Sequence, residues 1–178
     1  MHASKLHHNG KLIEELKKLL NVTFKLKDLG ISISQRHYTL QILEVVGLLG
    51  AKPMNVSMDP NVKLRNFDQD LLSDPSSYRR LIGRLIYLTI SRLDIVSSVN
   101  KLSQFVAKPC KAHLSATHHL LGYLKSALGQ GIFISSAETF QLRAFADSNW
   151  ASCPNTRKST FDFCIFIGNS LVSWESKK

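Results

Sequence analysis

The sequence predicts an α+β fold, in which a helical bundle over residues 74–130 is followed by antiparallel strands over residues 131–178. Apolar residues recur every three or four positions in the first region, which is the period of an amphipathic helix. In the second region apolar and polar residues alternate, which is the period of a strand with one buried face. The segment Gly129-Gln130-Gly131 separates the two patterns and should end the last helix.

Three apolar stripes define the helices of the bundle. The first helix should begin at Pro75, because the Asp74 side chain can cap free amides and proline suits the first helical position. Its stripe contains Tyr78, Leu81, Ile82, Leu85, Ile86 and Ile90. The second stripe contains Ile95, Val96, Val99, Leu102 and Val106, and the third contains Leu114, Leu121, Leu124 and Leu128. No such helix can bury its stripe alone, so we expect the three to pack together.

The region after Phe140 has the pattern of three antiparallel strands. Alternating runs at 140–147 and 160–167 are followed by Gly168-Asn169, a favourable hairpin turn, and by a returning run at 171–174. We therefore expect a three-stranded meander.

Two further regions precede the bundle. Residues 1–47 should form a helix, two strands and a second helix, at Lys11–Leu20, Val22–Lys27, Ile31–Ser34 and Gln35–Val46. The second helix should end at Gly47 and bury Tyr38, Ile42, Val45 and Val46. Residues 48–73 contain two prolines and little periodicity, which is typical of an extended linker lying over the helices.

Composition and charge limit the class of protein. The chain is 44% hydrophobic and 20% charged, and it contains no apolar run long enough to span a bilayer. The first residues lack the apolar core of a signal peptide, so we expect an intracellular protein with no membrane partner, in an undetermined compartment. Three widely spaced cysteines indicate neither a disulfide framework nor a zinc site. The net charge of +10 favours a polyanionic partner, although soluble proteins with surplus lysine are common.

Many short segments, in a fixed order, carry a family resemblance. They include Phe24-x-x-Lys27-Asp28-Leu29-Gly30, Met58-Asp59-Pro60-Asn61, Arg92-x-Asp94-Ile95, Asp147-x-x-Trp150 and Leu171-Val172-Ser173-Trp174. Together they resemble the Pol polyprotein of copia-type retrotransposons, of the plant type, where the end of reverse transcriptase passes into ribonuclease H. The resemblance implies a palm remnant at 1–47, a linker at 48–73, a thumb-like or connection-like bundle at 74–130, and truncated ribonuclease H-like strands at 131–178.

The chain departs from this family after Gly30. Related proteins carry a further hairpin there, whereas this chain passes directly to Ile31. The N-terminal part could then be loosely ordered, or the strands at 22–27 and 31–34 could form a weak hairpin. We favour the hairpin.

The resemblance directs attention to carboxylates, because both family enzymes use two metal ions held by acidic residues. No adjacent pair of aspartates occurs in the sequence, and Asp68-Gln69-Asp70 reads as a solvated turn. By resemblance, Asp147 is the first catalytic aspartate of ribonuclease H. Asp162 and Ser148-Asn149 depart from the family pattern, and Glu138 and Glu175 read as solvated. We therefore expect a vestigial Asp147, no metal site and no cofactor, with Mg²⁺ needed only by the intact family enzyme.

Basic residues gather on or beside the helical region. The candidates for nucleic-acid contact are Arg79, Arg80, Arg84, Lys101, Lys108, Lys111 and Lys125. The resemblance implies that they meet the sugar–phosphate backbone of an RNA–DNA hybrid or duplex without reading its sequence. For Arg80 and Arg84, which share a helix face with Tyr87, a solvated face is an equal alternative. Arg92 and Asp94 should instead pair locally, with Asp94 as a cap, and fix a turn between two helices.

Histidine and tryptophan residues have simpler interpretations. His7-His8, His113 and His118-His119 do not share helix faces, which favours partly exposed side chains over a metal site. Trp150 and Trp174 are expected to pack in or around the core.

Three functional hypotheses follow. The first is a fragment of a copia-type reverse transcriptase and ribonuclease H that does no catalysis by itself. The second is a charge-driven nucleic-acid-binding module without sequence specificity, and the third is residual metal-dependent ribonuclease H activity at Asp147. An unpaired strand edge near Asp147 would also favour loose order or self-association.

Overall fold

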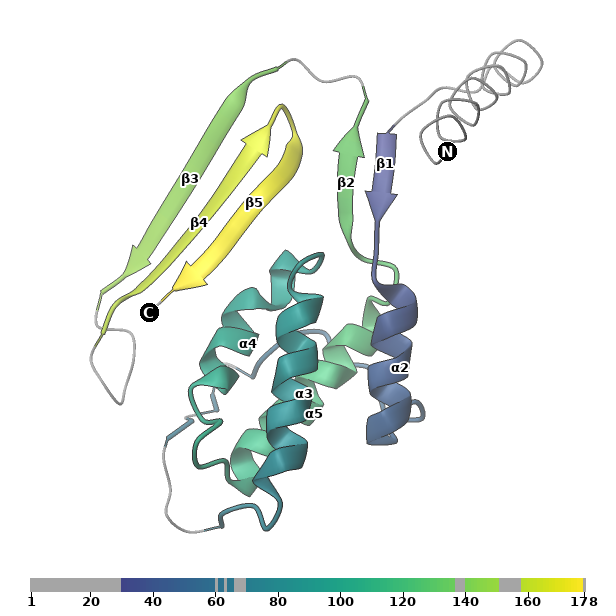
Figure 1. Ribbon diagram of the computed structural model, residues 1–178, viewed down its shortest axis with the longest axis vertical. Coiled ribbons are helices and arrows are strands. Elements are labelled where there is room, and N and C mark those ends of the chain that lie inside the picture. Colours follow the sequence, from purple (N-terminus) through teal and green to yellow (C-terminus); the bar gives the residue numbers. More distant parts are fainter. Residues whose placement is uncertain are drawn as a thin grey trace, which may run out of the picture.

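The computed structural model describes residues 30–59, 61–62, 64–65, 70–136, 140–150 and 158–177. The predicted helix Lys11–Leu20 and strand Val22–Lys27 lie outside these residues, as do His7-His8, Asp68-Gln69 and Glu138. Over the described residues the fold is of the predicted mixed α+β class, with four α-helices and two small antiparallel sheets (Figure 1). The helices are α2 (Arg36–Val46), α3 (Pro75–Leu88), α4 (Val96–Ser103) and α5 (Lys111–Ser126), with a 3₁₀ turn, η1, at Leu93–Ile95. The strands are β1 (Gly30–Ile33), β2 (Ile132–Ser135), β3 (Leu142–Asn149), β4 (Thr160–Ile167) and β5 (Ser170–Lys177).

Helix α3 begins as the sequence predicts. The Asp74 carboxylate accepts a hydrogen bond from the Ser76 amide at 2.9 Å, and Pro75 occupies the first turn. Its apolar stripe differs from the prediction at the C-terminal end, because Ile86 and Ile90 are 50% and 60% exposed while Leu88 is buried. Leu88 lies two turns after the buried Leu81, whereas Ile86 lies at the edge of the stripe and Ile90 follows the end of the helix.

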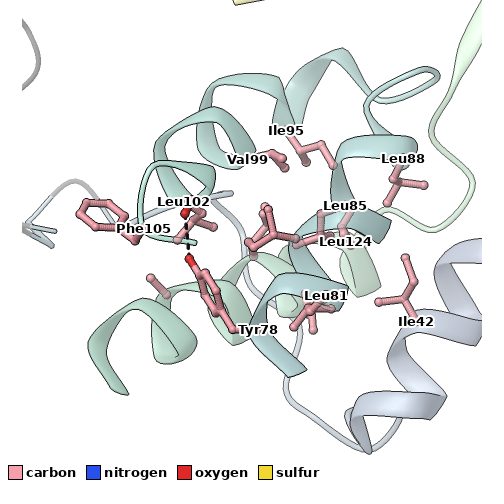
Figure 2. Close-up of a cluster of buried hydrophobic side chains, with 14 of the residues drawn as sticks. Ile42, Tyr78, Leu81, Leu85, Leu88, Ile95, Val99, Leu102, Phe105 and Leu124 are labelled. Carbon is pink, nitrogen blue, oxygen red and sulfur yellow. Dashed lines mark hydrogen bonds between the residues drawn. The ribbon is translucent and has the colours of Figure 1, made fainter. Parts of the chain in front are cut away.

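The core lies between α3, α4 and α5, and α2 closes one side of it (Figure 2). Its fully buried side chains include Tyr78, Leu85, Leu88, Ile95, Leu102, Leu120 and Leu124. The Tyr78 hydroxyl donates to the Leu102 carbonyl at 2.9 Å, which ties α3 to α4 inside the apolar cluster. Burial raises the pKa of Tyr78 to about 12, so this hydroxyl keeps its proton.

Helix α2 buries most of the predicted face, with Leu43 in place of Val45. Ile42 is buried as expected, and Tyr38 and Val46 pack against the core, but Val45 is 67% exposed. Leu43 occupies the core because it adjoins Ile42 on the side that faces α3 and α5. The helix ends at Gly47 with a φ of 74°, a left-handed conformation that glycine adopts without strain.

The strand β1 pairs with β2, a partner far along the chain. Gly30 stands opposite Ser135, and Ile33 opposite Ile132. The expected hairpin partner of β1, Val22–Lys27, lies outside the described residues. A Cβ atom at Gly30 would overlap the Ile134 carbonyl oxygen, so this close backbone approach requires glycine.

The strands β3, β4 and β5 form the predicted meander, in that order, with Gly168-Asn169 at the second turn. The sheet lies beside α4 (Figure 1). Trp174 donates its indole N–H to the Thr89 carbonyl at 2.9 Å, and the Asn100 amide donates to the Ser176 carbonyl at 3.1 Å. These contacts place β5 against the bundle and leave β3 at the outer edge of the sheet.

The segment between α2 and α3 has no helix or strand in its described residues, apart from a single β-bridge between Leu71 and Cys110. Two contacts hold this segment against the helices. The Met54 amide donates to the Gly122 carbonyl at 3.1 Å, and Leu64 is buried in the core.

Candidate functional site

The basic residues named from the sequence contact different parts of the bundle. Arg79 donates from Nε to the Val106 carbonyl at 2.8 Å and from Nη2 to the Ala107 carbonyl at 3.2 Å. Its guanidinium therefore holds the segment that follows α4. Because only part of its hydrogen-bonding capacity is used, Arg79 can also meet an anion at the surface.

Lys111 and Lys125 lie at opposite ends of α5 and make contacts within the chain. The Lys111 ammonium is 3.5 Å from the Asp70 carboxylate, and both side chains are largely exposed. Lys125 is half-buried and donates to the Ala51 carbonyl at 2.6 Å. Lys125 thus fixes the extended segment against α5 and is a weak candidate for nucleic-acid contact.

Arg80 and Arg84 lie one turn apart on α3. Arg80 is exposed, and Arg84 is half-buried in a groove of about 360 Å³ between the two helices. The groove is lined by Tyr38, Gln41, Ile42, Glu44, Val45 and Arg84. The Tyr38 and Tyr87 rings meet edge to face with centroids 5.2 Å apart, and Tyr87 is 53% exposed. This surface, the Arg80–Arg84 row, combines cations with an exposed aromatic ring.

Lys101 on α4 and Lys108 before α5 are both exposed. They complete the set of basic residues, which is distributed over α3, α4, α5 and the segment between α4 and α5. The sequence did not indicate that Tyr38 and Gln41 line the groove between α2 and α3. Its pattern predicts Tyr38 only as a core residue of α2.

Arg92 is a structural residue, as its local pairing with Asp94 predicts. Its guanidinium is 1% exposed, donates to both Asp94 oxygens at 2.9 and 2.7 Å, and donates to the Ala127 carbonyl at 2.8 Å. The Tyr123 hydroxyl donates to the same carboxylate at 2.8 Å. Burial works against ionisation of Asp94, but the bonds from Arg92 and Tyr123 outweigh it and lower its pKa. Asp94 makes no capping bond at the start of η1 or α4, so the expected cap is wrong.

Asp147 lies in a groove of about 270 Å³ between the sheet and the start of α4. Asp162 and Glu175 line the same groove, which the sequence did not predict. Asp147 stands directly opposite Asp162 in the β3–β4 register, so these two carboxylates share a face of the sheet. Glu175 stands opposite Phe163, the neighbour of Asp162, and so belongs to the other face. Among the described residues, no group of three or more acidic, histidine or cysteine side chains could hold a metal ion.

His113 is fully buried, contrary to the expectation of a partly exposed side chain. Its ring stacks on Phe105 with centroids 3.9 Å apart, and its Nδ1 accepts from the Cys110 amide at 3.1 Å. Nδ1 therefore lacks a proton, and Nε2 donates to the Arg65 carbonyl at 3.0 Å. The Cys110 thiol is 3.4 Å from Nδ1, and it and His113 form a capping box at the start of α5. Cysteine is not among the preferred N-cap residues, which are Ser, Thr, Asp and Asn, so the sequence did not indicate this cap.

The two tryptophans differ in environment. Trp174 packs against the bundle through its bond to Thr89, as expected of a rim residue. Trp150 is 91% exposed, so its expected role in packing is wrong. It follows the last residue of β3 and points into solvent.

With the fold and the grooves established, the chain can be compared with known proteins. It is 37% identical over 165 residues to the Retrovirus-related Pol polyprotein from transposon RE1 of Arabidopsis thaliana, and 35% identical over 165 residues to that from transposon RE2. Each alignment covers 93% of this chain, which spans only 11% of the length of either polyprotein. The chain is also 35% identical over 160 residues to the uncharacterized mitochondrial protein AtMg00810 of the same plant, an alignment covering 89% of this chain and 66% of that protein.

No protein-family model and no solved structure matches the chain. The described fold is a mixed α+β arrangement of a helical bundle with a small antiparallel sheet. The chain belongs to the family of copia-type retrotransposon Pol polyproteins. This confirms the resemblance found in the sequence motifs. Among the described residues, no helix is long and apolar enough to cross a bilayer.

Proposed function

We propose that the chain is the segment of a copia-type Pol polyprotein in which the end of reverse transcriptase runs into the start of ribonuclease H. In this proposal it binds an RNA–DNA hybrid or duplex through charge and does no catalysis by itself. The family membership and the net charge of +10 support it. Contacts to phosphates neutralise backbone charge and release counterions, so the affinity should fall steeply with salt.

The Arg80–Arg84 row is the observation that carries this proposal. Several other cations are used inside the chain: Arg92 pairs with Asp94, and Lys125 binds the Ala51 carbonyl. Within the described part of the chain, Arg80 and Arg84 donate no hydrogen bond, and Arg80 interacts only through charge with the exposed Asp74. Tyr87 exposes its ring beside them. A phosphate backbone can meet the two guanidiniums, while a base that is unpaired at the end of the duplex stacks on the exposed ring.

The test is the affinity for a short RNA–DNA hybrid, measured by fluorescence anisotropy over a range of salt concentrations. We expect the double substitution Arg80→Gln with Arg84→Gln to weaken binding and to reduce the slope of log affinity against log salt by about 2. Lys52→Gln with Lys158→Gln is the matched control, since both lysines are exposed and the same charge is lost. Absence of binding at low salt, or equal losses in the two double variants, would contradict a site at the Arg80–Arg84 row.

Residual ribonuclease H activity is a second candidate, favoured by the shared groove of Asp147 and Asp162. Two carboxylates on one sheet face could recruit one divalent cation, whereas the two-metal reaction needs more ligands. We expect a labelled hybrid to stay intact with the chain in Mg²⁺ or Mn²⁺. Cleavage that disappears in Asp147→Asn would establish this second function instead.

A further inference from the structure

Strand β3 forms one edge of the sheet in the part of the chain that the structure describes. In the described residues β3 pairs with β4 on one side and with no strand on the other. Every side chain from Leu142 to Ser148 is exposed, and Phe145 remains 56% exposed. An edge of this kind presents a row of backbone N–H and C=O groups that can pair with another strand.

Charges along this edge are unbalanced within the described part of the chain. Asp147 stands opposite Asp162, and like charges directly opposed across two strands are destabilising. One oxygen of Asp162 is buried without a hydrogen-bond partner, and neither carboxylate forms an ion pair with a described cation. Negative charge on this face would therefore be stabilised by a cation brought to the edge of β3.

The same strand carries such a cation at a symmetric position. Arg143 lies two residues before Phe145, and Asp147 lies two residues after it. The Arg143 guanidinium donates from Nε and Nη2 to the Gly168 carbonyl and the Asn169 side chain. These contacts use three of its five N–H donors, which leaves the remaining donors available for a carboxylate.

We propose that two copies of this chain join through β3, antiparallel and centred on Phe145. In this register Arg143 faces the partner's Asp147, and Ala144 faces the partner's Ala146. The two Phe145 rings meet at the two-fold axis, where an aromatic cross-strand pair is favourable. The contact uses the same surface on both copies, and it joins the two sheets into one in the order β5-β4-β3-β3-β4-β5.

Charge selects this register over its neighbours. Moving the centre to Ala144 or Ala146 leaves Arg143 and Asp147 without opposite charges across the pair. Moving it to Arg143 or Asp147 places like charges face to face. The proposed register therefore places Arg143 of each copy beside the Asp147–Asp162 pair of the other copy. This inference concerns assembly alone and does not depend on nucleic-acid binding.

A charge-swap series measured by sedimentation equilibrium on the full chain tests the proposal. We expect the unchanged chain to dimerise. Arg143→Glu or Asp147→Arg alone should weaken dimerisation roughly tenfold or more, because residues 143 and 147 then carry like charges at both places where they meet across the two-fold axis. The double variant Arg143→Glu with Asp147→Arg exchanges the charges and should restore the dimer.

The double variant also lacks the Arg143 bonds to the β4–β5 turn. If it dimerises, the loss of dimer in Arg143→Glu alone comes from the charges and not from damage to that turn. Circular dichroism of the helical bundle checks folding in all variants. Hydrogen exchange gives a second measurement: amides of residues 142–148 should become more protected as protein concentration rises. A monomer at every concentration, or an association that all three variants leave unchanged, would overturn the proposal.

Discussion

Individual buried polar residues do much to fix the geometry of this chain. Arg92 is the clearest case, since its guanidinium joins Asp94 at the start of η1 to the Ala127 carbonyl after α5. The Tyr123 hydroxyl completes the same network. Burying a charge is costly unless it is paired and hydrogen-bonded, and this network meets both conditions.

Removing Arg92 should therefore cost far more than removing an exposed arginine. We expect Arg92→Met to lower the free energy of unfolding by about 3 kcal/mol, because Asp94 and the Ala127 carbonyl lose their partner. Arg79→Met is the matched control and should cost no more than about 1 kcal/mol, because Arg79 is exposed. Urea denaturation measures both, and equal losses would show that the network contributes nothing special.

Some of these hydrogen-bond partners could be predicted from the sequence, and others could not. Arg92 and Asp94 are close in sequence, so their pairing could be inferred without a structure. The roles of Tyr123 and Ala127 could not, because both meet Arg92 only after α5 has packed against η1. His113 was equally inaccessible to sequence reasoning, since its partners come from Arg65, Phe105 and Cys110.

At the scale of the helix, the start of α5 is sensitive to protonation of His113. Burial lowers the pKa of His113 below its ordinary value of 6.5, although the bond to the Arg65 carbonyl opposes this shift. The neutral ring is required because its Nδ1 accepts from the Cys110 amide. The groups that face it are the Phe105 ring, the Cys110 thiol and the Arg65 carbonyl.

Stability should accordingly fall as the solution becomes acidic. Above pH 6.5 the ring is neutral in both states, whereas below it the unfolded chain takes up a proton that the folded chain resists. The free energy of unfolding should drop by up to about 1.4 kcal/mol per pH unit from pH 6.5 down to the folded-state pKa. Denaturation at several pH values measures this. His118, whose pKa burial also lowers, requires a His118→Gln background as control. An unchanged slope in His113→Leu within that background would contradict the assignment.

Helices and strands differ in how well sequence reasoning predicted them. Asp74 and Pro75 predict the start of α3, and Gly47 predicts the end of α2, because a helix cap depends only on residues close in sequence. The extent of the buried stripe on α3 was wrong at Ile86, because that residue lies at the border of the packed face. The pairing of β1 with β2 was not predicted, because a four-residue strand gives no sign of a distant partner.

Over the whole molecule, burial is concentrated in the bundle, and exposure in the sheet. The fully buried apolar side chains come from α2 to α5, whereas all described side chains of β3 are exposed. The Asp147 groove lies where these two parts meet. The division of the chain into palm, linker, thumb-like and ribonuclease H-like regions stays a prediction, since it derives from the family and not from any packing contact.

The arrangement of the candidate site residues also could not be predicted from the sequence. Sequence motifs identified Asp147 and the basic residues, but their spatial distribution depends on tertiary structure. Register alone determines that Asp162 shares a face with Asp147 while Glu175 belongs to the other face. A one-residue change in that register would reverse the assignment, because successive side chains of a strand lie on opposite faces.

Binding without cleavage is the central claim, and one measurement tests it most directly. The chain is mixed with a labelled RNA–DNA hybrid in Mg²⁺ over a range of salt, and the same samples are assayed for binding and then for strand length. The account predicts a bound, full-length hybrid at low salt that dissociates steeply as salt rises. A shortened RNA strand, or a hybrid that remains unbound at the lowest salt, would contradict it.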